Sequence, residues 1–392
     1  MGRKLIFLIL AGATVLGFAG TDLVLPAVPV LPRALGGSVA QAQYVLASFT
    51  GGMAAGLMLF GALAGRARER VLVAGSLAVY GLVSLLCALS PTLEVLIGLR
   101  FAQGMASAGA AVFAPGIVRR LYPESAVTAL GAIGAIESLA PALAPIAGWG
   151  LLPLGGWRGG FLVIAALALA LAALTLRAGG WPAEPPRAPG SYAALLRRPG
   201  FALLALGHAA TVAALLVFVF GAPVVFTRVL GASITAFIAM QVMGVGLFIV
   251  ASLSAGALAA RLGSGRLIAL GTGLALAGGI GLLGYALADG RDVWRVSGIF
   301  LLLNLGLGLR GPAGFNAALA RAGGDEARGA ALIVVAMLAL PALGTALVAP
   351  VILAGLVPIA LAAALYATVA ALATLVALAE PRPMAHGERH GE

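Results

Sequence analysis

The chain has 392 residues, of which 62% are hydrophobic and only 9% are charged. A soluble domain is close to half apolar and about a quarter charged, so this composition excludes a soluble globular protein and predicts a polytopic membrane protein. The net charge of +11 could indicate nucleic-acid binding, but the distribution of Lys and Arg along the chain indicates membrane orientation instead.

The first apolar run begins at about residue 5, after Arg3 and Lys4, and continues past Thr21. Such a start resembles a cleavable signal peptide, but we predict a retained first helix because the apolar pattern runs on. Asp22 lies near the outer end of this run and is followed by three prolines. An acid at membrane depth costs about 2.5 kcal/mol or more, so Asp22 is a candidate functional residue.

Runs of about 20 mostly apolar residues are long enough to span a membrane as helices. The sequence contains twelve such runs, which predicts an all-α membrane protein with twelve transmembrane helices. The runs lie at about 5–28, 40–63, 71–90, 93–118, 127–150, 157–176, 200–226, 232–260, 265–287, 294–318, 328–351 and 355–379.

One stretch between the sixth and seventh runs has a different composition. Residues 177–199 contain five prolines, four arginines and a glutamate, which is typical of a linker. This stretch divides the chain into halves of similar size. We therefore predict an N-terminal six-helix bundle (1–176), a cytoplasmic linker (177–199), a C-terminal six-helix bundle (200–380) and a cytoplasmic tail (381–392).

The positive charges alternate between the loops. With both termini placed in the cytoplasm, 17 Lys and Arg residues fall on the cytoplasmic side and 5 on the opposite side. This asymmetry follows the positive-inside rule and predicts an even number of spans. The opposite set is Arg33, Arg158, Arg228, Arg291 and Arg295, and the two arginines inside predicted helices are Arg100 and Arg310.

The two halves of the chain share short matching segments. With a shift of 195 residues, RALGGS at 33–38 aligns with RVLGAS at 228–233, and GALAGR at 61–66 aligns with GALAAR at 256–261. The tripeptide PAL at 141–143 recurs 200 residues later. Matches in the same order and in equivalent loops predict two parallel six-helix repeats, which is the plan of a transporter with its site between the halves.

Five motifs carry a resemblance to a known family. They are DLVLPAVP at 22–29, GALAGR at 61–66, RFAQG at 100–104, APALAPIAG at 140–148 and GWR at 156–158. With these motifs the chain resembles the major facilitator superfamily over essentially its whole length. Its first half resembles the drug:proton antiporters of the bicyclomycin/chloramphenicol-resistance type. The resemblance implies a major facilitator fold and proton-coupled transport without a cofactor.

The resemblance also implies where the gates lie. In the family, charged contacts of the loop after the second helix hold the cytoplasmic side shut, which assigns Arg66 and Arg70 to gating. The Gly/Pro-rich fifth helix supplies Pro141, Pro145 and Gly148, which permit bending and close packing.

The chain departs from the family at two positions. Relatives carry an acid in the loop after the second helix where this chain has Gly65, and the second repeat has Ala260 there. Glu69 is the residue in the same loop that could substitute for the missing acid. The second departure is Thr14, two helical turns before Asp22, where some relatives place a second carboxylate.

Two ionisable residues of the predicted helices lie at similar depth. By their distances from the outer helix ends, roughly 9 and 10 Å at about 1.5 Å per residue, Asp22 and Arg100 are level. We expect an acid and a guanidinium to attract each other there, so that protonation of Asp22 releases Arg100, as proton coupling requires. The alternative is a fixed ion pair that only joins two helices.

Further polar residues of the helices predict a substrate site. Glu137, one turn before Pro141, is either a proton- or cation-binding group or a hydrogen-bonded structural acid. Arg310 is a candidate contact for an anionic substrate group, a balancing charge for Glu137 or part of a structural network. Gln103 and Asn304 are polar enough to line a wet cavity, and we place them in the same predicted site.

The sequence is therefore interpreted as a monomeric, multi-pass transporter of the bacterial inner (cytoplasmic) membrane that exports a small amphiphilic or drug-like compound in exchange for protons. The alternatives are a proton-coupled uptake symporter and a transport-deficient receptor or partner protein of the same fold. An ATP-driven pump is disfavoured because G-x-x-x-x-G-K-[ST] is absent. Neither a nucleophile–base pair nor a metal-ligating cluster is recognisable, so we predict no enzyme and no metal. The expected partners are the substrate, protons and lipid, and not nucleic acid.

Overall fold

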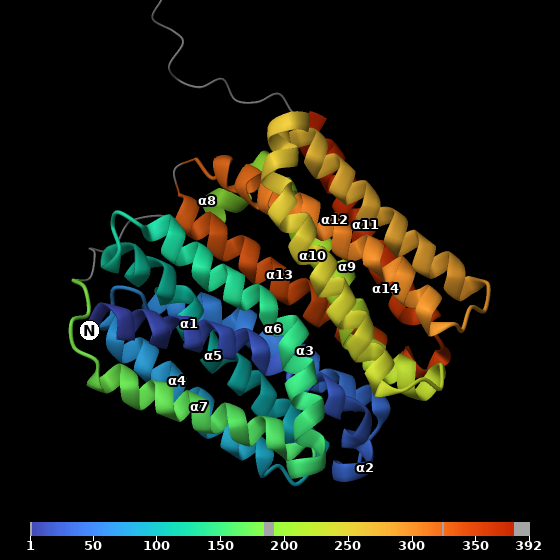
Figure 1. Ribbon diagram of the computed structural model, residues 1–392, viewed down its shortest axis with the longest axis horizontal. Coiled ribbons are helices and arrows are strands. Elements are labelled where there is room, and N and C mark those ends of the chain that lie inside the picture. The colour runs from blue at the N-terminus through green and yellow to red at the C-terminus, as the bar shows by residue number, and fades with distance from the viewer. Residues whose placement is uncertain (1, 184–191, 324, 380–392) are drawn as a thin grey trace, which may run out of the picture.

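The computed structural model describes residues 2–183, 192–323 and 325–379, which are largely helical (Figure 1). Twelve helices are long and apolar enough to cross a membrane, which confirms the predicted all-α membrane fold. Their bounds are α1 (Gly2–Asp22), α3 (Val39–Leu63), α4 (Glu69–Ala88), α5 (Leu93–Leu121), α6 (Ala126–Gly155), α7 (Arg158–Arg177), α9 (Pro199–Val224), α10 (Ile234–Leu262), α11 (Ser264–Leu287), α12 (Val293–Ala320), α13 (Glu326–Val348) and α14 (Val357–Ala379).

Short helical segments extend three of the long helices at the same end of the molecule. The segments are η1 (Leu25–Val30) and α2 (Leu31–Leu35) after α1, the π-helical η2 (Val225–Val229) after α9, and η3 (Ala349–Ala354) after α13. Prolines in η1 and η3 lack the backbone donor that a continuing α-helix needs. A further short helix, α8 (Tyr192–Leu196), lies in the predicted linker, whereas residues 184–191 and the predicted tail lie outside the described residues.

The repeat found in the sequence corresponds to a repeated turn. Gly36 and Gly231 both have positive φ angles, 75° and 66°, which glycine adopts without steric cost. Two residues later, Ser38 and Ser233 cap the next helix: the Ser38 Oγ accepts the Gln41 N–H at 3.1 Å, and the Ser233 Oγ accepts the Ala236 N–H at 3.2 Å. The matching residues are therefore those that end one helix and start the next.

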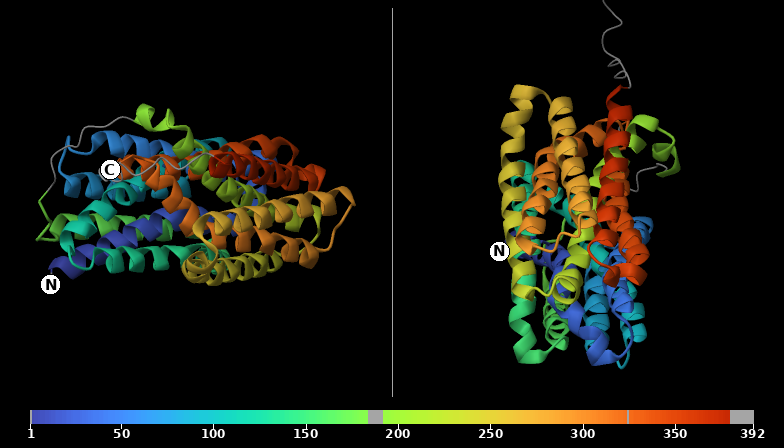
Figure 2. Two further views of the ribbon diagram at one scale, coloured as in Figure 1. Left: turned by 90° about the horizontal axis from the view of Figure 1, so that it is seen from above. Right: turned by 90° about the vertical axis from the view of Figure 1, so that its right-hand side faces the viewer.

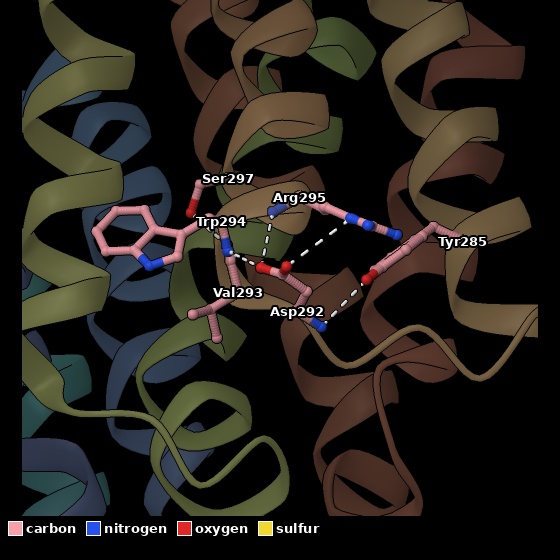
Figure 3. A network of polar contacts seen from close by, with 6 residues as sticks. All are labelled: Tyr285, Asp292, Val293, Trp294, Arg295 and Ser297. Carbon is pink, nitrogen blue, oxygen red and sulfur yellow. Dashed lines mark hydrogen bonds and ion pairs between the residues drawn. The ribbon is translucent and has the colours of Figure 1, made fainter.

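A polar network fixes the start of α12 (Figure 3). The Asp292 carboxylate accepts hydrogen bonds from the backbone N–H groups of Trp294 at 2.8 Å and Arg295 at 3.3 Å, which caps the helix. The Tyr285 hydroxyl, at the end of α11, accepts the backbone N–H of Asp292 at 3.1 Å.

Glycines allow several helix pairs to pack backbone to backbone. A Cβ on Gly52 of α3 would lie 2.1 Å from the carbonyl oxygen of Phe101, and a Cβ on Gly104 of α5 would lie 2.0 Å from that of Phe49. In the second half of the chain, a Cβ on Gly306 of α12 would lie 2.5 Å from the carbonyl oxygen of Gly271 on α11. Small residues therefore set the tightest helix contacts, as is usual in membranes.

The helices form two groups that lie side by side (Figure 1, Figure 2), α1–α7 as the first group and α9–α14 as the second. Contacts between the groups include α3 with α13 and α6 with α10. At the end that carries η1, η2 and η3, one apolar cluster is continuous between the groups and includes Val28 and Phe218. Toward the other end, the buried apolar residues separate into clusters that belong mainly to one group each.

The end with η1, η2 and η3 is hereafter the closed end. A hydrogen bond also crosses between the groups there, from Arg228 Nη2 to the carbonyl oxygen of Pro29 at 2.9 Å. In addition, η1 contacts α9, and η3 contacts α3. The two groups are thus joined by apolar packing and a hydrogen bond at the closed end.

Candidate functional site

Asp22 is the last residue of α1, immediately before the chain turns into η1. Its side chain is buried, with 9% of its surface exposed. Among the described residues it forms no hydrogen bond and no ion pair. An acid held in this way, without a partner in an apolar environment, is rare in membrane helices unless it has a function.

Arg100, in α5, is fully buried and joins three helices. Its Nε donates to the carbonyl oxygen of Val45 on α3 at 3.1 Å, and its Nη1 donates to that of Gly20 on α1 at 3.1 Å. Nη1 also donates to Oε1 of Gln103, one turn along α5, at 2.7 Å. The Phe49 ring lies 4.1 Å from the guanidinium carbon, a cation–π distance. Arg100 is therefore held mainly by carbonyl oxygens and an aromatic face.

The ion pair that the sequence predicted between Asp22 and Arg100 is absent from the described residues, so that expectation is wrong for this conformation. The two residues are nevertheless close in depth, because Arg100 reaches the carbonyl oxygen of Gly20, two residues before Asp22. The α1 backbone comes near because Gly20 has no side chain: a Cβ there would lie 2.5 Å from the Tyr80 hydroxyl. Arg100 thus holds the helix next to Asp22 and leaves its carboxyl unpaired.

Gln103 extends this arrangement to α4. Its Nε2 donates to the hydroxyl of Ser84 at 2.7 Å, and the Ser84 hydroxyl donates to the carbonyl oxygen of Tyr80 at 2.6 Å. The Tyr80 hydroxyl in turn donates to the carbonyl oxygen of Leu16 on α1 at 3.0 Å. The fully buried Gln103 is therefore part of a network inside the first group, and its contact with substrate stays a prediction.

Glu137 lies half-buried on α6 and faces α1. Its carboxyl lies beside the side chain of Thr14, whose hydroxyl donates to the carbonyl oxygen of Ala11 at 3.1 Å. Thr14 precedes Asp22 by eight residues, or about 12 Å along α1 at 1.5 Å per residue. The two intramembrane acids therefore lie along the same pair of helices, with Asp22 nearer the closed end.

A close backbone contact between α6 and the turn after α1 lies directly beside Asp22. A Cβ on Gly148 would lie 2.1 Å from the carbonyl oxygen of Leu23, so the two backbones touch there. The same helix contains Pro141 and Pro145, yet it continues unbroken from Ala126 to Gly155. The gating role of Pro141, Pro145 and Gly148 stays a prediction. Gly148 contacts the backbone of Leu23, the residue that follows Asp22.

The predicted substrate residues of the second half lie inside the second group. Arg310 is fully buried on α12, and its Nη1 donates to the carbonyl oxygen of Gly207 on α9 at 2.7 Å. Asn304, 3% exposed, donates from Nδ2 to the carbonyl oxygen of Phe300 at 3.2 Å. Both side chains are thus directed to helices of their own group in this conformation, and their contact with substrate stays a prediction.

The loop after α3 and the first turn of α4 contain the other predicted gating residues. Arg70 donates to the carbonyl oxygens of Thr175, at 3.0 Å, and Leu176 at the end of α7, whereas Arg66 is exposed. Glu69 forms an ion pair with Arg120 at the end of α5. These contacts join α4 to two helices of the first group.

The missing family acid falls at a special backbone conformation. Gly65 has a φ of 72°, which glycine adopts freely and which aspartate tolerates better than most other residues. The sequence alone gives no sign of this angle.

Sequence reasoning did not assign Phe49, Ser84 or Tyr80, which surround the buried Arg100 network. One signal was available for Phe49, because it lies three residues before Gly52 and so on the same helix face toward α5. Ser84 and Tyr80 share a face of α4 at a spacing of four residues, but nothing in the sequence indicates that this face meets Arg100.

Comparisons with known proteins agree on the family. Residues 10–347 match the model of the Major Facilitator Superfamily. Over 178 residues the chain is 33% identical to a chloramphenicol resistance protein of Pseudomonas aeruginosa, covering 45% of this chain and 42% of that protein. Over 172 residues it is 29% identical to the multidrug resistance protein MdtL of Escherichia coli O45:K1 (strain S88 / ExPEC), covering 43% and 44%. Each match therefore spans less than half of the relative.

Solved structures resemble the chain over nearly its whole length. A D-xylose-proton symporter superposes with a TM-score of 0.71 at 16% identity, covering 96% of this chain and 97% of that one. A bacterial homolog to the human lysosomal transporter Spinster, in an inward-facing and occupied conformation, gives a TM-score of 0.72 at 16% identity with the same coverage. At such identities the likeness concerns the fold alone.

Proposed function

We propose that this chain, which belongs to the Major Facilitator Superfamily, exports a small amphiphilic or drug-like compound in exchange for protons. As a family member with twelve candidate spans, it is a multi-pass membrane transporter and not an enzyme. The names of the Pseudomonas and Escherichia relatives, both resistance proteins, support export. Uptake by proton symport is the second candidate, because a buried acid beside the closed end could bind and release protons in an exporter and in an uptake transporter alike.

The observation that carries the proposal is the buried carboxyl of Asp22, without a protein partner at the end of α1. Proton uptake or release changes its charge next to Leu23, whose backbone touches α6 at Gly148. The two protonation states would therefore favour different packing of α1 on α6, which is the differential interaction that a conformational switch needs. Through Gly20, Arg100 would pass such a movement to α3 and α5.

We place the closed end at the outer face of the bacterial inner membrane, because the charge asymmetry of the loops assigns both termini to the cytoplasm. In this orientation the end at which the apolar clusters of the two groups separate faces the cytoplasm. Alternating access would follow from rocking of the N-terminal bundle (1–176) against the C-terminal bundle (200–380), which are joined by the linker at 177–199. No partner subunit is needed for this movement, so we propose a monomer.

Glu137 is the best placed of the proposed substrate contacts, because it is half-buried between α1 and α6. A carboxylate in that position suits a cationic or zwitterionic compound. Gln103, Asn304 and Arg310 are buried within their own groups, so we propose that they position the helices that would line the substrate path.

Proton movement in everted membrane vesicles tests the proposal. Respiration acidifies the lumen of such vesicles, and an antiporter that carries added compound inward releases protons outward, so the lumen becomes more alkaline. A symporter moves compound and protons in the same direction, and a receptor of the same fold leaves the lumen pH unchanged. Growth inhibition of an efflux-deficient host, with and without expression, supplies the compounds to try.

Gly148→Ala is expected to slow transport strongly, because the new methyl group must push α6 away from the carbonyl oxygen of Leu23. Overpacking of this kind typically costs about 1–3 kcal/mol of stability. Gly150→Ala is the matched control, since a Cβ there meets no atom within 4 Å. Initial transport rates and thermal midpoints of both variants are compared; equal rates would mean that the α1–α6 contact is not part of the transport cycle.

Glu137→Gln is expected to reduce export of cationic compounds far more than export of neutral ones. Glutamine keeps the side-chain size and a polar end group beside Thr14, so the main change is the loss of the charge. Export of a matched cationic and neutral pair is measured in the same vesicles.

Thr14→Val serves as the control for Glu137→Gln, because it removes the neighbouring hydroxyl and keeps the acid. We expect it to preserve the preference for cations. If Glu137→Gln depresses cationic and neutral compounds alike, Glu137 belongs to the proton path or to the scaffold, and the selectivity role is wrong.

A further inference from the structure

Gln43 of α3 is a buried amide without a hydrogen bond. Its side chain is 1% exposed, and neither its Nε2 nor its Oε1 has a partner among the described residues. Gln103, also buried in the first group, instead uses both ends of its amide, accepting from Arg100 and donating to Ser84. An amide that loses its hydration and gains no hydrogen bond destabilises the conformation that buries it.

Thr345 of α13 is in the same situation. It is 3% exposed, and its hydroxyl has no partner in the described part of the chain. Buried threonines of other helices, such as Thr50, Thr211 and Thr272, donate to the carbonyl oxygen four residues earlier in their own helix, at 2.9, 2.8 and 2.7 Å. Thr345 forms no such bond, so its burial is not compensated within α13.

Gln43 lies on the side of α3 that faces the second group. It precedes Gly52, whose backbone touches α5, by about two and a half helical turns, so the two residues lie on opposite sides of α3. Away from α5, the main neighbours of α3 are α13 and η3 of the second group. A Cβ on Gly51 would lie 3.8 Å from the Cβ of Ala342, so α13 approaches α3 closely. Gln43 is therefore buried by the contact between the two groups.

Thr345 lies at the same end of this contact. It is one turn after Ala342 and so on the side of α13 that faces α3 and α9. Because α3 begins at the closed end and α13 ends there, Gln43 and Thr345 lie about 6 and 5 Å from those helix ends at 1.5 Å per residue. The closed end thus buries two polar side chains without partners, one from each group.

We propose that Gln43 and Thr345 weaken the closed end so that it opens during transport. While the end is closed, both side chains lack hydrogen bonds, and when the groups separate there, water supplies them. Only the open state gains this hydration, which is the differential interaction that shifts a two-state equilibrium. The apolar cluster and the hydrogen bond from Arg228 to Pro29 act in the opposite direction. The inference rests on the alternating access of the proposed function, but it concerns the opening equilibrium and not the compound carried.

The test measures how often the closed end opens. Val28, fully buried in the apolar cluster shared by the two groups, is changed by Val28→Cys in a Cys87→Ala background. A charged thiol reagent does not enter from the lipid, so it modifies Val28→Cys only while the closed end is open, and the modification rate follows the open fraction. The purified protein in bilayer nanodiscs needs no substrate and no proton gradient, so the result does not depend on export.

Gln43→Met and Thr345→Val, each added to this background, are expected to slow modification about fivefold or more. The new side chains have similar size but gain no hydrogen bonds from water, so opening loses its advantage. Thermal unfolding midpoints are measured on the same preparations and are expected not to fall, because replacing an unpartnered polar group by an apolar one of the same shape is neutral or stabilising.

Thr374→Val is the matched control. The Thr374 hydroxyl is also buried without a partner among the described residues, but it packs against α9 inside the second group, 2.8 Å from where a Cβ on Gly207 would lie. This contact stays closed when the two groups separate. Thr374→Val is therefore expected to leave the modification rate unchanged.

The proposal is overturned if Gln43→Met and Thr345→Val leave the rate unchanged or lower the unfolding midpoint, because the side chains would then have hydrogen bonds that hold the end closed. Equal slowing by Thr374→Val would also overturn it, since the effect would not belong to the closed end. If Val28→Cys is never modified, even with Gln43 and Thr345 present, the closed end does not open, and alternating access itself is wrong.

Discussion

Vesicles that carry Asp22→Asn are expected to lose export against a gradient while they still bind the exported compound. Asparagine keeps the size of the side chain and most of its hydrogen-bonding capacity, but it can neither take up nor release a proton. The protein would then stay in the state that corresponds to a neutral carboxyl. Because protons no longer compete, binding of the compound is expected to survive or tighten. Lumen pH and compound accumulation are measured together, with binding measured on purified protein.

Two further measurements make this result specific. Exchange of labelled for unlabelled compound needs no net proton movement, so we expect Asp22→Asn to retain it. Asp289→Asn, an exposed acid in the loop between α11 and α12, is expected to export normally. Normal export against a gradient by Asp22→Asn would make Asp22 a structural residue and leave Glu137 as the next candidate for coupling.

The fold could be predicted from the sequence because the membrane imposes helix lengths. The twelve apolar runs of the sequence correspond to the twelve helices that are long and apolar enough to span a membrane. The least accurate boundary was that of the first run, predicted to reach residue 28, whereas α1 ends at Asp22. The apolar composition continues through η1, which is why the sequence predicted a longer helix. The α-helix ends earlier because the prolines of η1 lack the backbone N–H groups that a continuing α-helix needs.

The candidate site could be predicted only in part, because its main contacts are made by backbone atoms. Depth along the helices placed Asp22 and Arg100 at one level, and the bond from Arg100 to Gly20 agrees with that level. Every residue has a carbonyl oxygen, so no residue type marks the ones that accept from a buried arginine. The absence of a side chain at Gly20 lets α1 approach Tyr80 and Phe49 closely. The sequence does not show that these two side chains lie beside Gly20, so this role of the glycine could not be predicted.

Arg100→Lys is expected to destabilise the protein by about 3 kcal/mol or more and to stop transport, although it keeps the positive charge. A single ammonium group cannot donate both to Val45 on α3 and to Gly20 on α1 while it also reaches Gln103. Each buried acceptor left without a donor costs about 1–3 kcal/mol. Thermal unfolding midpoints and initial transport rates are measured on the same preparation.

Arg158→Lys is the matched control for Arg100→Lys. Arg158 also donates from Nε to a carbonyl oxygen, that of Ala88 at 3.0 Å, and lies over the Trp157 ring at 4.3 Å, but it is exposed. Exposed contacts of charged groups contribute little, so this variant is expected to stay close to the unmodified protein. An unchanged midpoint for Arg100→Lys would show that the buried network does not hold the first group together.

A double variant separates the structural role of Arg100 from a role in coupling. In the present conformation Arg100 bonds to the backbone beside Asp22 and not to its carboxyl, so the effects of Asp22→Asn and Arg100→Lys on stability are expected to add. Their effects on transport should not add, because either change alone already stops the cycle. If the stability effects fall well short of additivity, the two side chains form an ion pair in another state of the cycle, and Arg100 then acts directly on the charge of Asp22.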